Sequence, residues 1–296
     1  MIKRTIYIGN PAYLKLFQNQ MLIQQPGTKE KLGSIPIEDM AILLLDNHQI
    51  TLTTQLITGL QGNNVVIITT DAHHLPLGMM LPVYGHSEYS ERIKIQLQAS
   101  EPLKKQLWKQ TVERKIYNQK KLLQLFDKPS AAMDFYLKNV KSGDTTNMEG
   151  IAAQYYWKNL FDDFSRERFG AAPNNMLNFG YAILRAIVAR ALVSSGLLPV
   201  LGIFHKNKYN PYCLADDIME PYRPFVDKMV YNYKLQNPIP TELNREVKAY
   251  LLQIATHDVV IDKKIRPLMV AVTTTTASLY RCFLGKSRLI AYPEID

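Results

Sequence analysis

The sequence predicts an α+β fold in which a small N-terminal β-sheet or sandwich domain, residues 1–85, precedes a larger all-α domain, residues 86–296. Three observations predict this organisation. Short β-rich runs separated by turn residues fill the first 82 residues or so. Beyond residue 87 the apolar period changes from two to about 3.6, which is typical of helices. A length of 296 residues also allows two moderate domains.

The expected strands of the N-terminal domain are short, and turn signals such as Gln25-Pro26-Gly27 and Asp46-Asn47 lie between them. Repeated short strands at this spacing favour a small sheet or sandwich. One short helix, residues 53–59, interrupts the series, and residues 82–87 form the expected boundary. The strands are expected at residues 5–8, 13–17, 21–24, 33–37, 41–45, 65–69 and 77–81.

The helices of the C-terminal domain follow from apolar residues at helical spacing, with Pro102 in a first turn and Gly196 and Gly285 after last turns. The apolar segment 176–195 carries Arg185 and Arg190 near its middle, so it is expected to be a core helix and not a bilayer span. The helices are expected at residues 88–99, 102–126, 131–140, 147–167, 174–195, 214–235, 241–256 and 267–284.

The formal net charge of +9 lies entirely beyond residue 85, because residues 1–85 hold five Lys and Arg against five Asp and Glu. Contacts from Lys and Arg to phosphates supply most nonspecific affinity for nucleic acid, so the second domain is expected to meet a polyanion. The alternative is that the positive charge serves only solubility. The basic residues considered are Lys104, Lys105, Lys109, Arg114, Lys115, Arg166, Arg168, Lys206, Lys208, Arg223, Lys263, Lys264 and Arg266.

Cysteine content and the N-terminus indicate the compartment. Only Cys213 and Cys282 are present, which argues against a disulfide framework and for a reducing environment. The first residues lack the apolar stretch of a signal peptide. We therefore expect a cytoplasmic protein with no membrane partner. No Gly-x-Ser-x-Gly signature occurs, so the sequence gives no support to covalent serine chemistry.

Glu149 is the first candidate site residue. On a helix that begins near Asn147 it shares a stripe with the apolar residues Ala152, Tyr156 and Leu160. An ionised carboxylate directed into such a surface needs an ion pair, hydrogen bonds or a metal. The alternative is a carboxylate at the helix start that reaches solvent or complements the helix dipole.

His205 is the second candidate, at the point where an apolar run gives way to a basic loop containing Lys206 and Lys208. An imidazole in that position is suited to face a phosphate, to bind a metal or to transfer a proton. The alternative is a structural histidine.

The third candidate segment is 214–224, in which Asp217 and Glu220 lie on one polar stripe of a helix. Carboxylates spaced by three residues repel each other unless a cation compensates. Pro221 and Pro224 remove the amides that would bond the carbonyls of Asp217 and Glu220, so a kink is expected there. A solvated acidic face is the alternative.

Two carboxylates and one imidazole, Glu149, Glu220 and His205, suit Mg²⁺ or Mn²⁺ better than a structural zinc site. Asp217 is a further candidate ligand. Asp216 stands beside it, and because one residue turns a helical side chain by about 100°, the sequence leaves open which of the two faces the metal.

The segments Asn147-Met-Glu149-Gly-Ile-Ala152, Phe204-His205 and Leu214-Ala-Asp-Asp-Ile-Met-Glu220-Pro-Tyr-Arg-Pro224, in this order, resemble the CRISPR-associated integrase/endonuclease family Cas1 of the spacer-acquisition complex. The resemblance extends over nearly the whole chain and is closest to the versions of type II systems. It implies a β-rich dimerisation domain before a helical catalytic domain. It also implies metal binding by Glu149, His205 and Glu220.

The function implied by the resemblance is a metal-dependent DNA integrase/endonuclease that inserts foreign DNA fragments into a CRISPR repeat array. The reaction would be a transesterification in which a 3′-hydroxyl attacks a repeat phosphodiester, with Mg²⁺ or Mn²⁺ as cofactor. The implied partners are double-stranded DNA, both protospacer and repeat, a second copy in a homodimer, and the small subunit Cas2 of antiviral adaptation.

Two alternatives remain open at this point. The same three ligands would serve a metal-dependent nuclease that uses water as the nucleophile. A DNA-binding scaffold with structural carboxylates is the other, and it predicts that Glu149→Ala and Glu220→Ala retain full activity.

Overall fold

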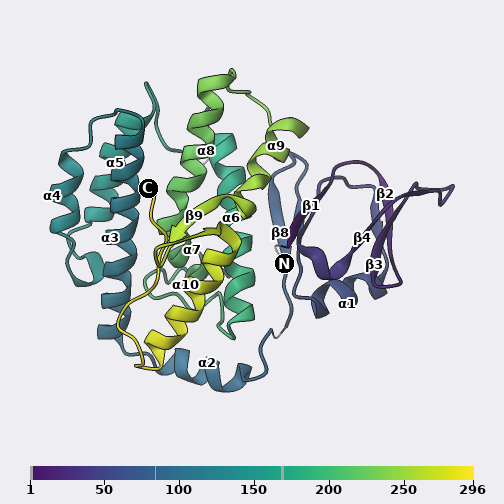
Figure 1. Cartoon of the computed structure of the whole chain (residues 1–296), viewed down its shortest axis with the longest axis horizontal. Helices are drawn as coiled ribbons and strands as arrows, with labels where there is room; N and C mark the ends of the chain where they lie inside the picture. The colour runs from purple at the N-terminus through teal and green to yellow at the C-terminus, as the bar shows by residue number, and fades with distance from the viewer. Residues whose placement is uncertain (1–2, 84, 168–169) are drawn as a thin grey trace.

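The computed structural model describes residues 3–83, 85–167 and 170–296, and it contains an N-terminal β-rich part and a larger helical part, as predicted (Figure 1). Residue 84, within the expected boundary, and Arg168, among the basic residues considered, lie outside the described residues. The position of a domain boundary at residue 85 and a dimerisation role for residues 1–85 remain predictions.

The β-rich part consists of two four-stranded sheets with one helix, α1 (Thr54–Gly62), between its strands in sequence. The first sheet has the order β1-β5-β7-β8, with β8 antiparallel to three parallel strands. The second has the order β4-β3-β2-β6. The strand bounds are β1 Arg4–Ile8, β2 Ala12–Phe17, β3 Gln20–Gln24, β4 Lys31–Pro36, β5 Met40–Leu45, β6 Ile50–Leu52, β7 Val66–Thr70 and β8 Pro76–Met80.

Strand β5 is buried along its whole length because both faces of its sheet are covered. Met40, Leu43 and Leu45 belong to the core of the β-rich part, whereas Ile42 and Leu44 belong to the core of the helical part. A continuous apolar run is typical of a strand covered on both sides. The first sheet is therefore a wall shared by two cores.

The helical part is organised around α3 (Glu101–Leu125) and α6 (Asn174–Ser194), with most of the other helices packed on them (Figure 1). By length and composition α6 would suffice to cross a membrane, but 83% of its most apolar window is buried inside the protein. This agrees with the expected core helix. The remaining helices are α2 Tyr89–Gln98, α4 Ala132–Lys138, α5 Met148–Leu160, α7 Cys213–Met219, α8 Arg223–Gln236, α9 Arg245–Leu252 and α10 Leu268–Phe283, with short 3-10 turns η1 Ile37–Asp39, η2 Ser142–Asp144, η3 Glu220–Tyr222 and η4 Gln253–Thr256.

The expected kink near Pro221 is present, because the segment predicted as one helix is split into α7, the 3-10 turn η3 and α8. Asn118 of α3 donates its side-chain amide to the Pro221 carbonyl oxygen at 2.8 Å. A carbonyl at the break is thus satisfied by a neighbouring helix, and η3 is fixed against α3.

Several expectations differ from the structure, among them strand β6, which was not expected. The helix expected over 147–167 ends at Leu160, because the next residue, Phe161, adopts an extended conformation (φ −121°, ψ 136°). The helix expected over 241–256 begins only at Arg245, where the Asn244 side chain accepts the Val247 amide as an N-cap. A small hairpin, β9 (Asp258–Ile261) and β10 (Lys264–Pro267), was not predicted and lies within the otherwise helical part.

Candidate active site

The candidate active site lies where α3, α5 and η3 meet, with Lys115 between Glu149 and Glu220. Lys115 Nζ donates to Glu149 Oε1 and, at 2.5 Å, to Glu220 Oε2. The side chains of Lys115 and Glu220 are 8% and 9% exposed, and that of Glu149 is 28% exposed. Two carboxylates from different elements therefore converge on one position that holds a positive charge.

Arg223 supplies a second cation to Glu220, since its Nε donates to Glu220 Oε1 at 2.8 Å. Burial opposes ionisation of Glu220, but Arg223 and Lys115 outweigh burial and lower the pKa of this carboxyl to about 2. Burial also opposes the charge of Lys115, and Glu220 and Glu149 outweigh it, so the pKa of Lys115 is raised. Lys115 and Glu220 are thus both ionised at neutral pH.

The local sequence explains how Glu149 reaches this position. Asn147 adopts a left-handed conformation (φ 52°) just before α5, which turns the chain sharply. The carboxylate of Asp144 accepts the amides of Met148 at 2.9 Å and Glu149 at 3.0 Å, so it caps the free amides of the first turn. The helix start is fixed, and Glu149 projects from it toward α3.

His205 lies beside Asp217, which organises the whole segment before it. Asp217 Oδ2 accepts the amides of Ile203 and Phe204 at 2.7 and 3.0 Å. Asp217 Oδ1 accepts the amide of His205 at 3.2 Å and contacts His205 Nδ1 at 2.5 Å. A Cβ at Gly202 would collide with the His205 carbonyl oxygen, so the tight approach of this loop to Asp217 requires glycine.

The imidazole of His205 is held by aromatic rings as well as by Asp217. Trp108 of α3 stacks on Phe204 at 4.2 Å between ring centroids, and both rings meet the His205 ring edge to face. The hydrogen bond with Asp217 raises the pKa of His205, against the effect of burial. Because Nδ1 is occupied by Asp217, Nε2 is the ring nitrogen that remains for chemistry.

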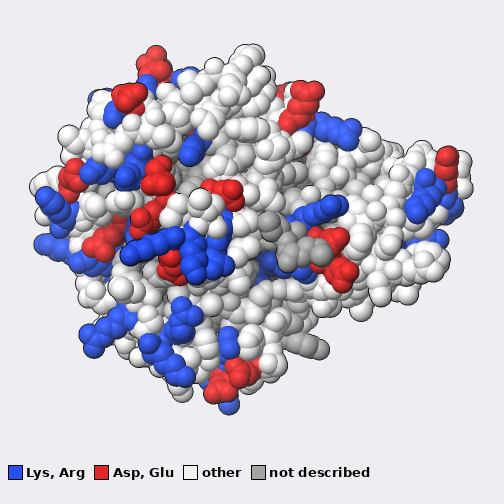
Figure 2. All heavy atoms as spheres, viewed as in Figure 1, with Lys and Arg blue, Asp and Glu red and all other residues white. Residues whose placement is uncertain are grey.

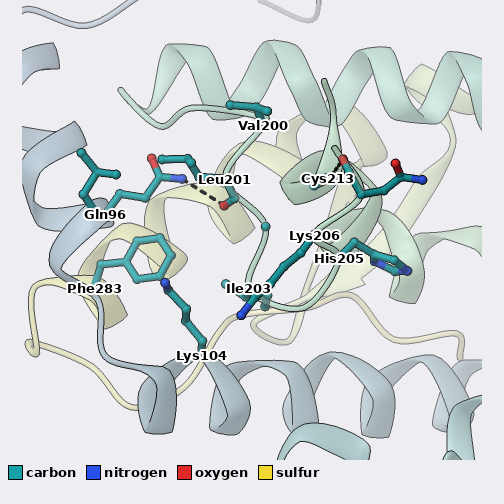
Figure 3. Close-up of a pocket in the computed structure, with 12 residues that line it drawn as sticks. Gln96, Lys104, Val200, Leu201, Ile203, His205, Lys206, Cys213 and Phe283 are labelled. Carbon is teal, nitrogen blue, oxygen red and sulfur yellow. Dashed lines mark hydrogen bonds between the residues drawn. The ribbon is translucent and has the colours of Figure 1, made fainter. Parts of the chain in front are cut away.

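A pocket of about 300 Å³ adjoins His205, with Lys104 and Lys206 among its lining residues. Figure 3 shows the side chain of Lys206 extending over this pocket, while the His205 ring is turned away from Gln96 and Phe283 on the other side. The amide of Gln96 donates to the carbonyl oxygens of Leu198 and Leu201 and fixes the pocket wall. The loop that carries His205 therefore rests on a rigid base.

The structure brings together two of the three predicted ligands, Glu149 and Glu220. Within residues 3–83, 85–167 and 170–296, no group of three or more His, Cys, Asp and Glu side chains is close enough to hold a metal ion. Asp217, the further candidate, is fully buried, and both of its oxygens already accept hydrogen bonds. Asp216 turns to the other side, where it pairs with Arg185 Nε at 2.6 Å.

One observation nevertheless indicates that a divalent cation would fit beside the two glutamates. The Lys115 ammonium, itself a cation, already lies between their carboxylates. Carboxylate oxygens are the ligands that Mg²⁺ and Mn²⁺ prefer. The chemistry of Glu149 and Glu220 therefore fits such a cation.

Sequence reasoning did not single out Lys115, although it counted it among the basic residues. A signal was present, because Lys115 continues a buried stripe of α3 formed by Trp108, Thr111 and Val112. A lysine on such a stripe requires a buried partner. Gln119, one turn further along α3, is 2% exposed and lines the pocket beside the glutamates, and no sequence signal marked it.

The comparisons with known proteins agree with each other. The family model described as "CRISPR associated protein Cas1" matches residues 6–263. A CRISPR-associated endonuclease Cas1 from Neisseria meningitidis serogroup C (strain 8013) is 34% identical over 298 residues, which cover 100% of this chain and 97% of that protein.

Two solved structures share the fold. A casposase bound to an integration product superposes with a TM-score of 0.80 and 20% identity, over 98% of this chain and 92% of the casposase chain. A chain of a Cas6-RT-Cas1–Cas2 complex superposes with a TM-score of 0.75 and 18% identity, over 100% of this chain and 36% of the longer one. At these identities the likeness shows the fold alone.

Proposed function

The chain belongs to the CRISPR-associated Cas1 family, and from that membership we propose that it inserts DNA fragments into the repeats of a CRISPR array. The observation that carries the proposal is the convergence of Glu149 and Glu220 on one buried cation position. An acidic pair built to hold positive charge is what phosphodiester chemistry with a divalent cation requires.

In this proposal Glu149, Glu220 and His205 hold Mg²⁺ or Mn²⁺. The cation, when bound, would supply the Lewis acidity that polarises the scissile phosphate and stabilises its developing charge. Glu149 and Glu220 supply oxygen ligands, and His205 presents Nε2 in an orientation set by Asp217. Asp217 acts through His205, so its role is to position the imidazole.

The reaction proposed is a transesterification. The 3′-hydroxyl oxygen of the incoming fragment bonds to a phosphorus of the repeat as the P–O bond to the neighbouring 3′-oxygen breaks, and that oxygen leaves as a new 3′-hydroxyl, so one proton is lost and one gained. The casposase that shares this fold was solved with an integration product, which supports strand joining over hydrolysis.

The partners follow from charge and family. We propose that DNA, both protospacer and repeat, lies along the helical half, which carries the whole net charge of +9. On the face seen in Figure 2, Lys and Arg side chains gather over that half between acidic ones. We further propose a homodimer, assembly with Cas2 as in the complex named above, a cytoplasmic location and a type II system.

Strand joining tests the proposal. A fragment with free 3′-hydroxyls and a repeat duplex are incubated with the protein, companion subunit and Mn²⁺, and joined product is measured. We expect joining by the wild type and a loss of at least about a hundredfold in Glu149→Ala and Glu220→Ala. Glu113→Ala is the matched control, because Glu113 is a partly exposed glutamate of α3 that pairs with Lys109.

The outcome separates the alternatives. Cleaved but unjoined repeat would identify a nuclease that uses water. Full joining by Glu149→Ala and Glu220→Ala would leave only a scaffold role for these carboxylates.

A further inference from the structure

We propose that Arg166 and Arg223, both packed against the Tyr181 ring, form a binding subsite for one DNA backbone phosphate beside Glu149 and Glu220. This inference rests on the proposed function. The subsite would bind the backbone of the reacting strand next to the acidic pair.

The subsite lies in a pocket of about 200 Å³ that opens beside the glutamates. Its walls include Lys115, Glu149 and Glu220 as well as Arg166, Tyr181 and Arg223. A ligand in this pocket would therefore touch both the acidic pair and the two arginines.

Tyr181 is a rigid platform because its hydroxyl donates to Asp227 Oδ1. Asp227 is 1% exposed and also accepts the Tyr156 hydroxyl at 2.8 Å. Burial raises the pKa of Asp227 to about 6, against the two tyrosine hydrogen bonds, so this acid compensates the nearby arginines only in part near that pH.

The two guanidinium groups pack against this ring. Arg223 Cζ lies 4.5 Å from the Tyr181 ring centroid and Arg166 Cζ lies 5.4 Å from it. A planar cation over an aromatic face keeps its edge free to bind a phosphate. The Tyr181 ring thus packs against both guanidinium groups.

Both arginines keep hydrogen-bond donors and positive charge with which to bind a ligand. Arg223 uses Nε for Glu220, and its two terminal nitrogens have no hydrogen-bond acceptor among the described residues. Arg166 is positioned by neutral acceptors, which are the Glu167 carbonyl oxygen at 2.9 Å, Asn174 Oδ1 at 2.8 Å and Asn178 Oδ1 at 2.7 Å. In the part of the chain that the structure describes, no carboxylate lies within ion-pair distance of Arg166.

A second observation marks the same pocket as a ligand site. Gln119 lines it, is 2% exposed, and has a buried side-chain oxygen without a hydrogen-bond partner among the described residues. Buried polar atoms are rarely left unpaired, because each costs about 1–3 kcal/mol. The two arginines offer donors to phosphate oxygens, and the Gln119 side-chain oxygen offers an acceptor to a hydroxyl. Phosphate oxygens and a hydroxyl are the polar groups at the end of a nucleic-acid strand.

Arg166→Gln tests the subsite, because glutamine removes the charge and Arg166 lies outside the acidic pair. Binding of a repeat duplex is measured by fluorescence anisotropy across a salt series. We expect a rise in Kd of roughly five- to tenfold and a decrease of about one in the slope of log K against log salt. Arg166→Lys retains charge and should keep the slope. Arg288→Gln, at an exposed arginine, is the matched control and should bind like the wild type.

A second arm locates the phosphate. Single methylphosphonate groups, which are neutral, are placed along the repeat strand around the insertion point. One position should weaken binding by the wild type and leave binding by Arg166→Gln unchanged, since the lost contacts are the same.

The results distinguish the two proposals. Wild-type affinity and slope in Arg166→Gln, or no methylphosphonate position that separates the two proteins, would overturn the subsite while strand joining stands. A wild type that binds DNA but forms no joined product would overturn the proposed function instead. Thermal unfolding checks that Arg166→Gln is folded. If Arg166→Gln is not folded, DNA binding by Arg166→Lys is compared with that of the wild type.

Discussion

Replacement of Lys115 by methionine tests whether this ammonium occupies the position of a divalent cation. The substitution keeps an unbranched side chain of similar length in α3 and removes one positive charge between Glu149 and Glu220. The two carboxylates then face each other with Arg223 as the remaining cation on Glu220.

The size of the expected loss of stability follows from the burial of these charges. Breaking a buried ion pair by removing one partner costs about 3–5 kcal/mol. Glu149 is 28% exposed and Arg223 still pairs with Glu220, so water and the guanidinium limit the loss. We expect Lys115→Met to unfold with about 3 kcal/mol less free energy than the wild type without divalent cations. In a chain of this size that lowers the Tm by roughly 6 to 12 °C.

Added Mn²⁺ should reverse much of this loss. A cation at one hundred times its Kd stabilises the folded state by about 2.7 kcal/mol. Because Lys115 no longer has to be displaced, Mn²⁺ should bind the variant at least about ten times more tightly, a difference of about 1.4 kcal/mol. Urea unfolding with and without Mn²⁺ gives the stabilities, and isothermal titration calorimetry gives the affinities.

Lys120→Met is the control, since Lys120 lies on the same helix and pairs with the half-exposed Asp134. A surface pair of this kind contributes only about 0–1 kcal/mol. The reasoning would be refuted if Lys115→Met bound Mn²⁺ no more tightly than the wild type, or if it were as stable as Lys120→Met in the absence of divalent cations.

Two further predictions concern the pocket next to the glutamates. Gln119→Met should raise the free energy of unfolding by about 1 kcal/mol in urea, because it removes a buried oxygen without a partner; an unchanged or lower stability would mean that this oxygen is satisfied. Asp227→Asn should become more stable than the wild type as pH rises. The pKa of Asp227 is raised from 3.8 to about 6 in the folded state, so its stabilising contribution is complete below pH 3.8 and is lost as pH rises through 6. That difference corresponds to about 3 kcal/mol between pH 3.5 and pH 7.5, measured as the gap between the two proteins' unfolding free energies, and a gap independent of pH would contradict it.

Elements with a strong local pattern could be predicted from the sequence. Strands β1, β2, β3, β5 and β7 lie within one residue of their expected bounds at each end, because alternation and turn residues are properties of adjacent positions. The hairpin β9–β10 could not be predicted in this way. Its turn places Asp262 and Lys263 at φ 48° and 60°, yet the Asp-Lys pair lacks the glycine that usually marks such turns.

For the candidate site too, local sequence patterns could predict some residues and not others. Glu149, His205 and Glu220 could be selected because each stands in an unusual local setting and because their order resembles a known family. The partners of Lys115 could not be predicted, since it meets Glu149 across 34 positions and Glu220 across 105, and such pairings are set by helix packing. Asp217 was considered for the metal, but only the loop folded over it reveals four donors to its oxygens.

The strand shared by two cores has a consequence for how this protein unfolds. If residues 1–85 were cut from the rest, Ile42, Leu44 and Val66 would leave the core of the helical part and face water. The isolated segment would carry an apolar sheet face prone to association, and the remaining helices would lose one wall. The two halves should therefore melt in one transition, and neither should be obtained as a stable monomer by itself.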